Sequence, residues 1–462
     1  MVDALADVAR WYRSQKLPGT SSPVSSDTRL HRILQLDATR AYLRTKIEAL
    51  TRHDHGCVSL EAALYIELLD PADPRLAHVV VDRMDTEQSK MAMERFAFNV
   101  SMAAQLRAFK KTQATRARID ATSVATVDAK DLSYDQFLAE YALPKRPVVL
   151  RGGAHLVLTK KMWSLASLGA NAAVASKPMP TKRYVHDSVQ WARLEDGPTM
   201  PLGAFVDGLE KSDLYVHDHS VPLHLPELVE DVAIPAIFAH DYLQRLPEGA
   251  LYRETWPSLF VGPKNTASQL HIDSFGSNFW MALLDGRKQW ILVDPRDMHL
   301  LRPRRYPGLH DVVFDVALPT TADDDPFWYA RREECVLEAG DLLFVPTGTP
   351  HYVRNLTATL ALSANYIDRS NAEVAVDALT RQASTDPRAG DVARHVAQCM
   401  RGPQPAAHAT QSVPFATFKS PMQAPDDAPP AAKRRRLDAE FLADWSSDDE
   451  APSDDGAALP QR

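Results

Sequence analysis

The feature that most constrains the fold is a series of short β-rich runs, separated by glycine and proline, in the middle of the chain. They are PVVLRG (147–152), DLYVHD (213–218), SLFVGP (258–263), QWILVD (289–294), DLLFVP (341–346) and TLALSANY (359–366). Each run has the length of a strand, is rich in aliphatic and aromatic residues, and ends in turn residues. Many short strands joined by turns predict a mainly β domain, built as a barrel or a sandwich.

The most specific pattern lies in the segment that ends at Asn355. Gly340 and Asp341 predict a turn, LLFVP predicts a strand, and residues 346–350 predict a tight loop from which His351 starts the next strand. A plain hairpin with an unligated histidine is the alternative. The fixed spacing of glycine, proline, histidine and asparagine favours a functional His351.

His271 and Asp273 are two residues apart, so on a strand their side chains point to the same face. Alone this pair is weak evidence, because a histidine beside a loop aspartate is common. With His351 it gives two imidazoles and one carboxylate, the set that non-haem Fe(II) oxygenases use while leaving coordination positions open. A structural zinc site has four protein ligands, and no fourth is evident in the sequence.

Lys288 lies at the turn that enters the run QWILVD. A lysine carried into a barrel interior needs an anionic partner, because an unpaired buried charge is costly. A dicarboxylate co-substrate would supply that partner. A solvated turn lysine is the alternative if Lys288 is considered without the metal pattern.

Residues 120–375, a little over half of the chain, resemble the JmjC, cupin-like 2-oxoglutarate oxygenases. The subgroup that the chain is most similar to includes protein hydroxylases and the Jumonji arginine demethylase/lysyl hydroxylase. The resemblance implies a double-stranded β-helix, also called a jelly-roll or cupin barrel. It is carried, in the family's order, by residues 132–152, 256–295 and 335–366.

The resemblance also implies roles for individual residues. His271, Asp273 and His351 match the ligands of a catalytic Fe(II), and Lys288 matches the lysine that binds the distal carboxylate of 2-oxoglutarate. O₂ is the second co-substrate. The remaining positions implied to face 2-oxoglutarate are Ser268, Ser363 and Asn365.

The implied function is an Fe(II)- and 2-oxoglutarate-dependent dioxygenase that hydroxylates or N-demethylates an amino-acid side chain of a protein substrate. An RNA or nucleoside hydroxylase is less favoured, because the formal net charge of −8 provides no general attraction for phosphates. A non-catalytic cupin that only binds a partner is a third possibility. It is disfavoured because no metal ligand and no lysine is lost.

The rest of the chain divides by composition. Leucine, isoleucine and methionine at three- and four-residue spacing predict an α-helical N-terminal region over residues 1–118. A C-terminal helix is predicted for 376–400, after the catalytic domain of 120–375. The proline-rich residues 401–462 predict a disordered tail.

Several features bear on location. The basic run Lys433–Arg436 is typical of a nuclear import signal, so we expect the nucleus or else the cytoplasm. Three widely spaced cysteines indicate no disulfide framework and fit a reducing compartment. No apolar run is long enough to predict a membrane span.

Overall fold

The computed structural model describes residues 58–59, 79–80, 87–402 and 410–419, except Asp187, Val189, 307–310 and Thr321. The predicted helices before residue 87 and the basic run Lys433–Arg436 therefore lie outside the described residues. Within the predicted helical region, β1 (Val58–Ser59) and β2 (Val79–Val80) pair in parallel. Among the described residues, no helix combines the length and apolar character needed to cross a bilayer.

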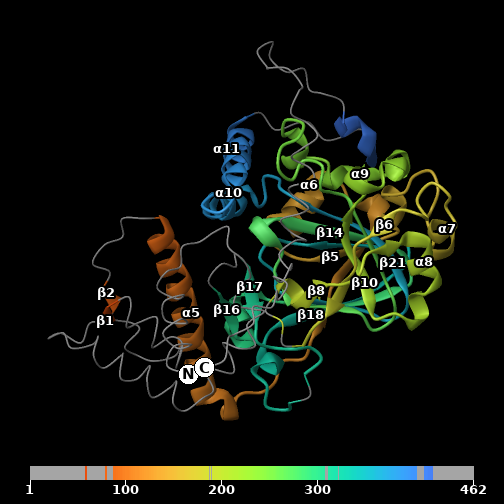
Figure 1. The fold of residues 1–462 in the computed structure, drawn as a ribbon. Helices are drawn as coiled ribbons and strands as arrows, with labels where there is room; N and C mark the ends of the chain where they lie inside the picture. The colour runs from red at the N-terminus through yellow and green to blue at the C-terminus, as the bar shows by residue number, and fades with distance from the viewer. Residues whose placement is uncertain are drawn as a thin grey trace, which may run out of the picture.

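Two facing β-sheets form the centre of the protein, which confirms the predicted jelly-roll fold (Figure 1). In spatial order the nine-stranded sheet consists of β4 (Ala125–Asp128), β5 (Val148–Arg151), β19 (Leu342–Val345), β14 (Asn278–Asp285), β21 (Thr359–Tyr366), β12 (Ser258–Gly262), β10 (Leu214–Ser220), β7 (Lys182–Tyr184) and β8 (Leu194–Asp196). The five-stranded sheet consists of β13 (Ala267–His271), β20 (His351–Asn355), β15 (Arg287–Val293), β18 (Arg332–Glu338) and β3 (Thr122–Ser123).

Alternation along the strands separates the interior of the jelly roll from its outer faces. On β14, Phe279 and Met281 belong to the core between the sheets, whereas Trp280 belongs to the core on the outer face. On β15, Trp290 points inward and Ile291 outward. Because successive side chains of a strand point to opposite faces, every second residue counted from these inward positions also faces the interior.

Helices cover the outer face of the nine-stranded sheet. The core there joins β-strand residues to Phe137 of α6 (Tyr134–Phe137), Leu379 of α10 (Ala372–Gln382) and Val392 of α11 (Pro387–Arg401). The single helix predicted for 376–400 is thus two helices. The chain breaks between them because Asp386 caps α11, its side chain accepting from Arg388 N, and Pro387 begins the new helix.

Part of the segment predicted as a disordered tail is also structured. Strand β22 (Ser412–Pro414) pairs with β11 (Ala233–Pro235), and η15 (Phe415–Lys419) follows it. Val413 and Phe415 are buried in the outer core. This apolar pair is too short to be recognised in a proline-rich sequence, so the prediction is wrong for residues 410–419.

The outer face of the five-stranded sheet packs against α5 (Glu87–Thr112) and η13 (Pro295–Leu301) (Figure 1). Phe109 of α5 contributes to this core, together with Leu301 and Phe327. The remaining α-helices and strands of the described residues are α7 (Leu165–Gly169), α8 (Leu202–Asp207), α9 (Val221–His224) and the strand pairs β6 (Pro178–Met179) with β9 (Met200–Pro201) and β16 (Pro303–Arg305) with β17 (Val312–Phe314).

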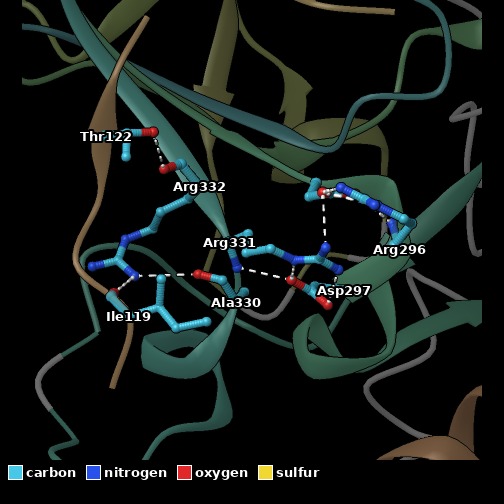
Figure 2. A network of polar contacts seen from close by, with 8 residues as sticks. Ile119, Thr122, Arg296, Asp297, Ala330, Arg331 and Arg332 are labelled. Atoms are coloured by element: carbon cyan, nitrogen blue, oxygen red, sulfur yellow. Dashed lines mark hydrogen bonds and ion pairs between the residues drawn. The ribbon is translucent and has the colours of Figure 1, made fainter. Parts of the chain in front are cut away.

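One short segment joins the edges of both sheets. β3 pairs in parallel with β18, and β4 pairs in parallel with β5, with Val124 between them buried in the interior core. Figure 2 shows how this segment is held: Arg332 donates from Nη1 to the carbonyl of Ile119 at 2.7 Å. Next to it, Arg331 donates from Nε to Asp297 at 2.7 Å.

Gly286 allows the tight turn from β14 to β15 that brings Lys288 into the sheet. Its φ is +83°, and a Cβ at this position would lie 2.0 Å from the carbonyl oxygen of Ala358. We expect Gly286→Ala to lower the unfolding free energy by about 4 kcal/mol or more, because backbone strain adds to a steric clash. Urea unfolding measures this change.

The matched control is Gly340→Ala. Gly340 has a φ of +100°, but no atom lies within 4 Å of the position that an added Cβ would take, so only backbone strain remains. We expect a loss of about 1–3 kcal/mol there. Equal losses at the two glycines would contradict the steric argument.

Candidate metal and co-substrate site

His271, Asp273 and His351 are brought together at one end of the five-stranded sheet. One ligand atom from each lies within 4.8 Å of the others. His271 ends β13 and His351 begins β20, and the two face each other in the antiparallel register with ring centroids 4.1 Å apart. Asp273 precedes η12 (Ser274–Gly276), but its carboxylate does not cap this turn.

A backbone carbonyl fixes the tautomer of each imidazole. His271 Nδ1 donates to the carbonyl of Gln269 at 2.6 Å, and His351 Nδ1 donates to the carbonyl of Thr349 at 2.9 Å. Each ring therefore keeps Nε2 unprotonated, the state in which histidine binds a metal. Two such nitrogens and a carboxylate oxygen fit Fe(II).

Burial controls the charge of this group. It lowers the pKa of His351 to about 4, and burial together with the neighbouring His351 lowers the pKa of His271. Burial also raises the pKa of Asp273 to about 7, opposed by a hydrogen bond from Asn365. Both imidazoles are thus neutral near pH 7, and a bound divalent cation would favour the ionised form of Asp273.

Thr347 connects the two segments that carry the candidate metal ligands. Its backbone N donates to Asn278 Oδ1 at 2.9 Å, and its Oγ1 donates to the carbonyl of Gly276 at 2.8 Å. The same carbonyl accepts from Asn371 Nδ2 at 2.9 Å. Buried Thr347 therefore ties the loop before His351 to the turn after Asp273.

Lys288 lies at the other end of the interior. It is 0% exposed, and its Nζ donates to Tyr215 Oη at 3.0 Å and to Asn355 Oδ1 at 2.8 Å. Among the described residues, no carboxylate lies within ion-pair distance of this ammonium. Burial lowers the pKa of Lys288 to about 7, so an anion that binds here would restore its charge.

The two ends share one face of the same strand. His351 pairs with Leu292 and Asn355 pairs with Lys288, four residues further along. The Cα atoms of His351 and Asn355 are about 13 Å apart at the usual rise of about 3.3 Å per residue. This span is long enough for a metal, a five-carbon dicarboxylate and the lysine end group in a row.

The other predicted residues lie on nearby interior strands. Ser268 is buried on β13, where it pairs with Val353. Ser363 is fully buried on β21, and its Oγ has no hydrogen-bond partner. Asn365 donates from Nδ2 to Ser277 Oγ at 2.7 Å, next to Asp273. Their roles toward 2-oxoglutarate stay predictions.

Three residues that the structure places in the site had no role predicted from the sequence. Tyr215 and Asn355 hold the Lys288 ammonium, as described above. The ring of Trp191 lies 4.2 Å from that of His271, and its Nε1 donates to the carbonyl of Ile272 at 3.3 Å. Alternation along the run DLYVHD could have indicated that Tyr215 points into the interior, whereas no local pattern marks Trp191.

Comparison with known proteins agrees with this arrangement. The family described as "Cupin-like domain" matches residues 134–372. The chain belongs to the cupin-like family. The resemblance to JmjC oxygenases that the motifs indicated is therefore confirmed.

Curated relatives match over the same region. The chain is 26% identical over 253 residues to "Arginine-specific demethylase JMJ22" of Arabidopsis thaliana, covering 52% of this chain and 46% of the relative. It is 25% identical over 268 residues to "Bifunctional arginine demethylase and lysyl-hydroxylase psr-1" of Caenorhabditis elegans (54% and 62%). It is 31% identical over 165 residues to "2-oxoglutarate and iron-dependent oxygenase JMJD4" of Homo sapiens (34% and 37%). The aligned regions span about half the length of these relatives.

The bridge through Thr347 predicts an effect on metal binding. Thr347→Val keeps the size of the side chain but removes the hydrogen bond to Gly276. The loop before His351 and the turn after Asp273 are then less firmly connected. We expect affinity for Mn(II), used in place of Fe(II), to fall about tenfold. Titration followed by electron paramagnetic resonance measures the free ion.

Thr181→Val is the matched control. Thr181 is equally buried, and its Oγ1 donates to the carbonyl of Pro198 at 2.7 Å, at the far edge of the nine-stranded sheet. We expect a similar loss of stability with unchanged Mn(II) affinity, whereas Thr347→Ser should recover binding. Equal weakening in both valine variants would contradict a positioning role.

The depressed pKa of Lys288 predicts a pH-dependent stability. Between about pH 7 and the ordinary lysine value of 10.5, the unfolded chain binds a proton that the folded chain does not, so stability rises with pH. Lys288→Met removes this contribution. We expect its stability advantage over the natural chain to be largest near pH 7 and to shrink by roughly 1 kcal/mol per pH unit toward pH 10.

Urea unfolding without metal or 2-oxoglutarate at pH 7, 8 and 9 measures this dependence. Lys264→Met, at an exposed lysine, is the control and should run parallel to the natural chain. A Lys288→Met profile that is also parallel would show that Lys288 keeps its ordinary pKa.

Proposed function

We propose that this protein is an Fe(II)- and 2-oxoglutarate-dependent dioxygenase that hydroxylates or N-demethylates a side chain of a protein substrate. One observation carries the proposal. Two imidazoles with unprotonated Nε2 atoms and a carboxylate lie on the same interior face as a buried ammonium, and this ammonium has no carboxylate partner among the described residues. The relatives named as oxygenases, demethylases and lysyl hydroxylases support the same reaction class.

Different residues would have different roles in such a reaction. His271, Asp273 and His351 would hold the ferrous ion, and Lys288, oriented by Tyr215 and Asn355, would bind the distal carboxylate of 2-oxoglutarate. When bound, iron with 2-oxoglutarate and O₂ supplies oxidation of an unactivated C–H bond, coupled to formation of succinate and CO₂. The buried surroundings of these groups exclude bulk water.

The surroundings of the metal ligands favour a cationic side chain, lysine or arginine, as the group that reacts. Trp191 offers an aromatic ring beside His271, and such rings attract cations. Asp311 accepts from Ser274 Oγ at 3.0 Å, next to Asp273, and Asp218 lies close enough to Asp273 for the two carboxylates to interact electrostatically. Hydroxylation of an N-methyl carbon gives a hemiaminal whose C–N bond breaks to release formaldehyde and the N–H group, so one site serves hydroxylation and demethylation.

The location of the protein stays a prediction. The basic run Lys433–Arg436 supports the nucleus, and it lies outside the described residues.

Turnover of 2-oxoglutarate against a library of lysine- and arginine-containing peptides tests the proposal. We expect succinate to form only with Fe(II) present and to stop on chelation by EDTA. Mass spectrometry should show a gain of one oxygen or a loss of one methyl group on a peptide. Asp273→Ala should remove activity, because it deletes one of the three ligands.

Asp315→Ala serves as the control because this exposed carboxylate lies outside the metal group. It should leave succinate formation unchanged. Peptide binding without any succinate formation in the Fe(II)-loaded natural chain would instead support a non-catalytic cupin.

A further inference from the structure

A group of arginines is contributed by α5, β16 and α10 and does not include the candidate metal ligands. Arg305 of β16 is held against α5: its backbone N donates to Asn99 Oδ1 at 2.8 Å, and its carbonyl accepts from Asn99 Nδ2 at 3.0 Å. The Arg305 guanidinium carbon lies 4.5 Å from the centre of the Phe98 ring. In Figure 1, α5 runs beside β16 and β17.

Arg95 belongs to the same group. It precedes Phe98 and Asn99 by three and four residues, so all three lie on one face of α5. The Nε atoms of Arg95 and Arg305 are both buried and have no hydrogen-bond partner. Neither guanidinium forms an ion pair with any described carboxylate.

Arg381, in the last turn of α10, completes the group. Burial lowers the pKa of Arg305, and the positive charge of Arg381 lowers it further. Glu94 and Asp311 act in the opposite direction, but neither lies within ion-pair distance of Arg305. The three arginines thus outnumber these two carboxylates, and no described carboxylate forms an ion pair with Arg305.

We infer that Arg95, Arg305 and Arg381 form a binding site for an anionic group, a carboxylate or a phosphate, on the protein substrate. Guanidinium groups bind both anions through paired N–H donors. An anion bound by the guanidinium groups would offset the repulsion between the arginines. The inference rests on the proposed function only in assigning the anion to the substrate.

The position of the arginine site favours a substrate. Asp311 lies close enough to influence Arg305 and also accepts from Ser274, the residue after Asp273. α10, which carries Arg381, packs against η12, the turn that follows Asp273. A substrate could thus present a cationic residue at the metal and an acidic or phosphorylated neighbour to the arginines.

A nucleic-acid phosphate is the competing occupant. The observations favour protein, because the chain carries a net charge of −8 and the carboxylates of Asp218 and Asp311 lie close enough to Asp273 to interact with it electrostatically. Repulsion from these carboxylates would oppose a polyanion that extended from the arginines toward the metal.

Binding of inorganic phosphate to the full chain tests the site without requiring turnover. The readout is the rise in the thermal unfolding midpoint with phosphate, relative to sodium chloride at equal ionic strength. Arg381→Glu is the main variant, because Arg381 is exposed and we expect its substitution to leave the fold intact. We expect its apparent dissociation constant for phosphate to be about tenfold higher than that of the natural chain.

Arg401→Glu is the matched control. Arg401 lies in the last turn of α11 and is also exposed, so the substitution makes the same change of charge outside the arginine site. We expect phosphate binding like that of the natural chain. Equal weakening in both glutamate variants, or no stabilisation by phosphate beyond that of chloride, would overturn the inference.

Peptides identify the source of the anion. Fluorescence anisotropy compares lysine-containing peptides with serine, glutamate or phosphoserine beside the lysine. Tighter binding of the glutamate peptide, the phosphoserine peptide or both is expected for the natural chain and Arg401→Glu, but not for Arg381→Glu. The order of the two anionic peptides shows which source is preferred.

Two outcomes separate this inference from the proposed function. A single-stranded oligonucleotide that displaces the peptides in an Arg381-dependent manner would overturn the assignment to a protein substrate. Arg381-dependent peptide binding without succinate formation would leave the arginine site intact and reject the proposed catalysis alone.

Discussion

The antiparallel pairing of β13 with β20 is the constraint on which the rest of the site depends. It sets His271 opposite His351, and a backbone carbonyl then turns each ring so that Nε2 is available. The same strand β20 carries Asn355 to the lysine end. One register therefore fixes both the metal ligands and the distance to the group that would bind the co-substrate.

Much of this could be predicted from the sequence, because metal ligands and turn residues occur at short fixed spacings. His271 with Asp273, and His351 after its proline–glycine loop, are local patterns of that kind. Strand alternation could indicate that Tyr215 points inward but not that it contacts Lys288, and no local pattern marks Thr347. Their roles arise from contacts between segments far apart in the chain, which depend on strand register and loop packing.

The two errors outside the site have different origins. Pro387 is visible in the sequence as a helix-start signal, but the helical pattern over 376–400 continues on both sides of it and conceals the break. The burial of Val413 and Phe415 depends instead on pairing with β11, almost 180 residues earlier in the chain. Local composition favoured a tail there, whereas a long-range contact decided the structure.

The segment around Val124 has a consequence for the solubility of the protein. Without this segment, β18 and β5 would be edge strands, and the unpaired backbone groups of an edge strand invite association with other chains. β3 pairs with Glu333 and Glu334 of the seven-residue β18, and β4 pairs with all four residues of β5. A shortened chain that starts after residue 128 would lose this protection at both edges together, and so would be prone to aggregate even with every metal ligand present.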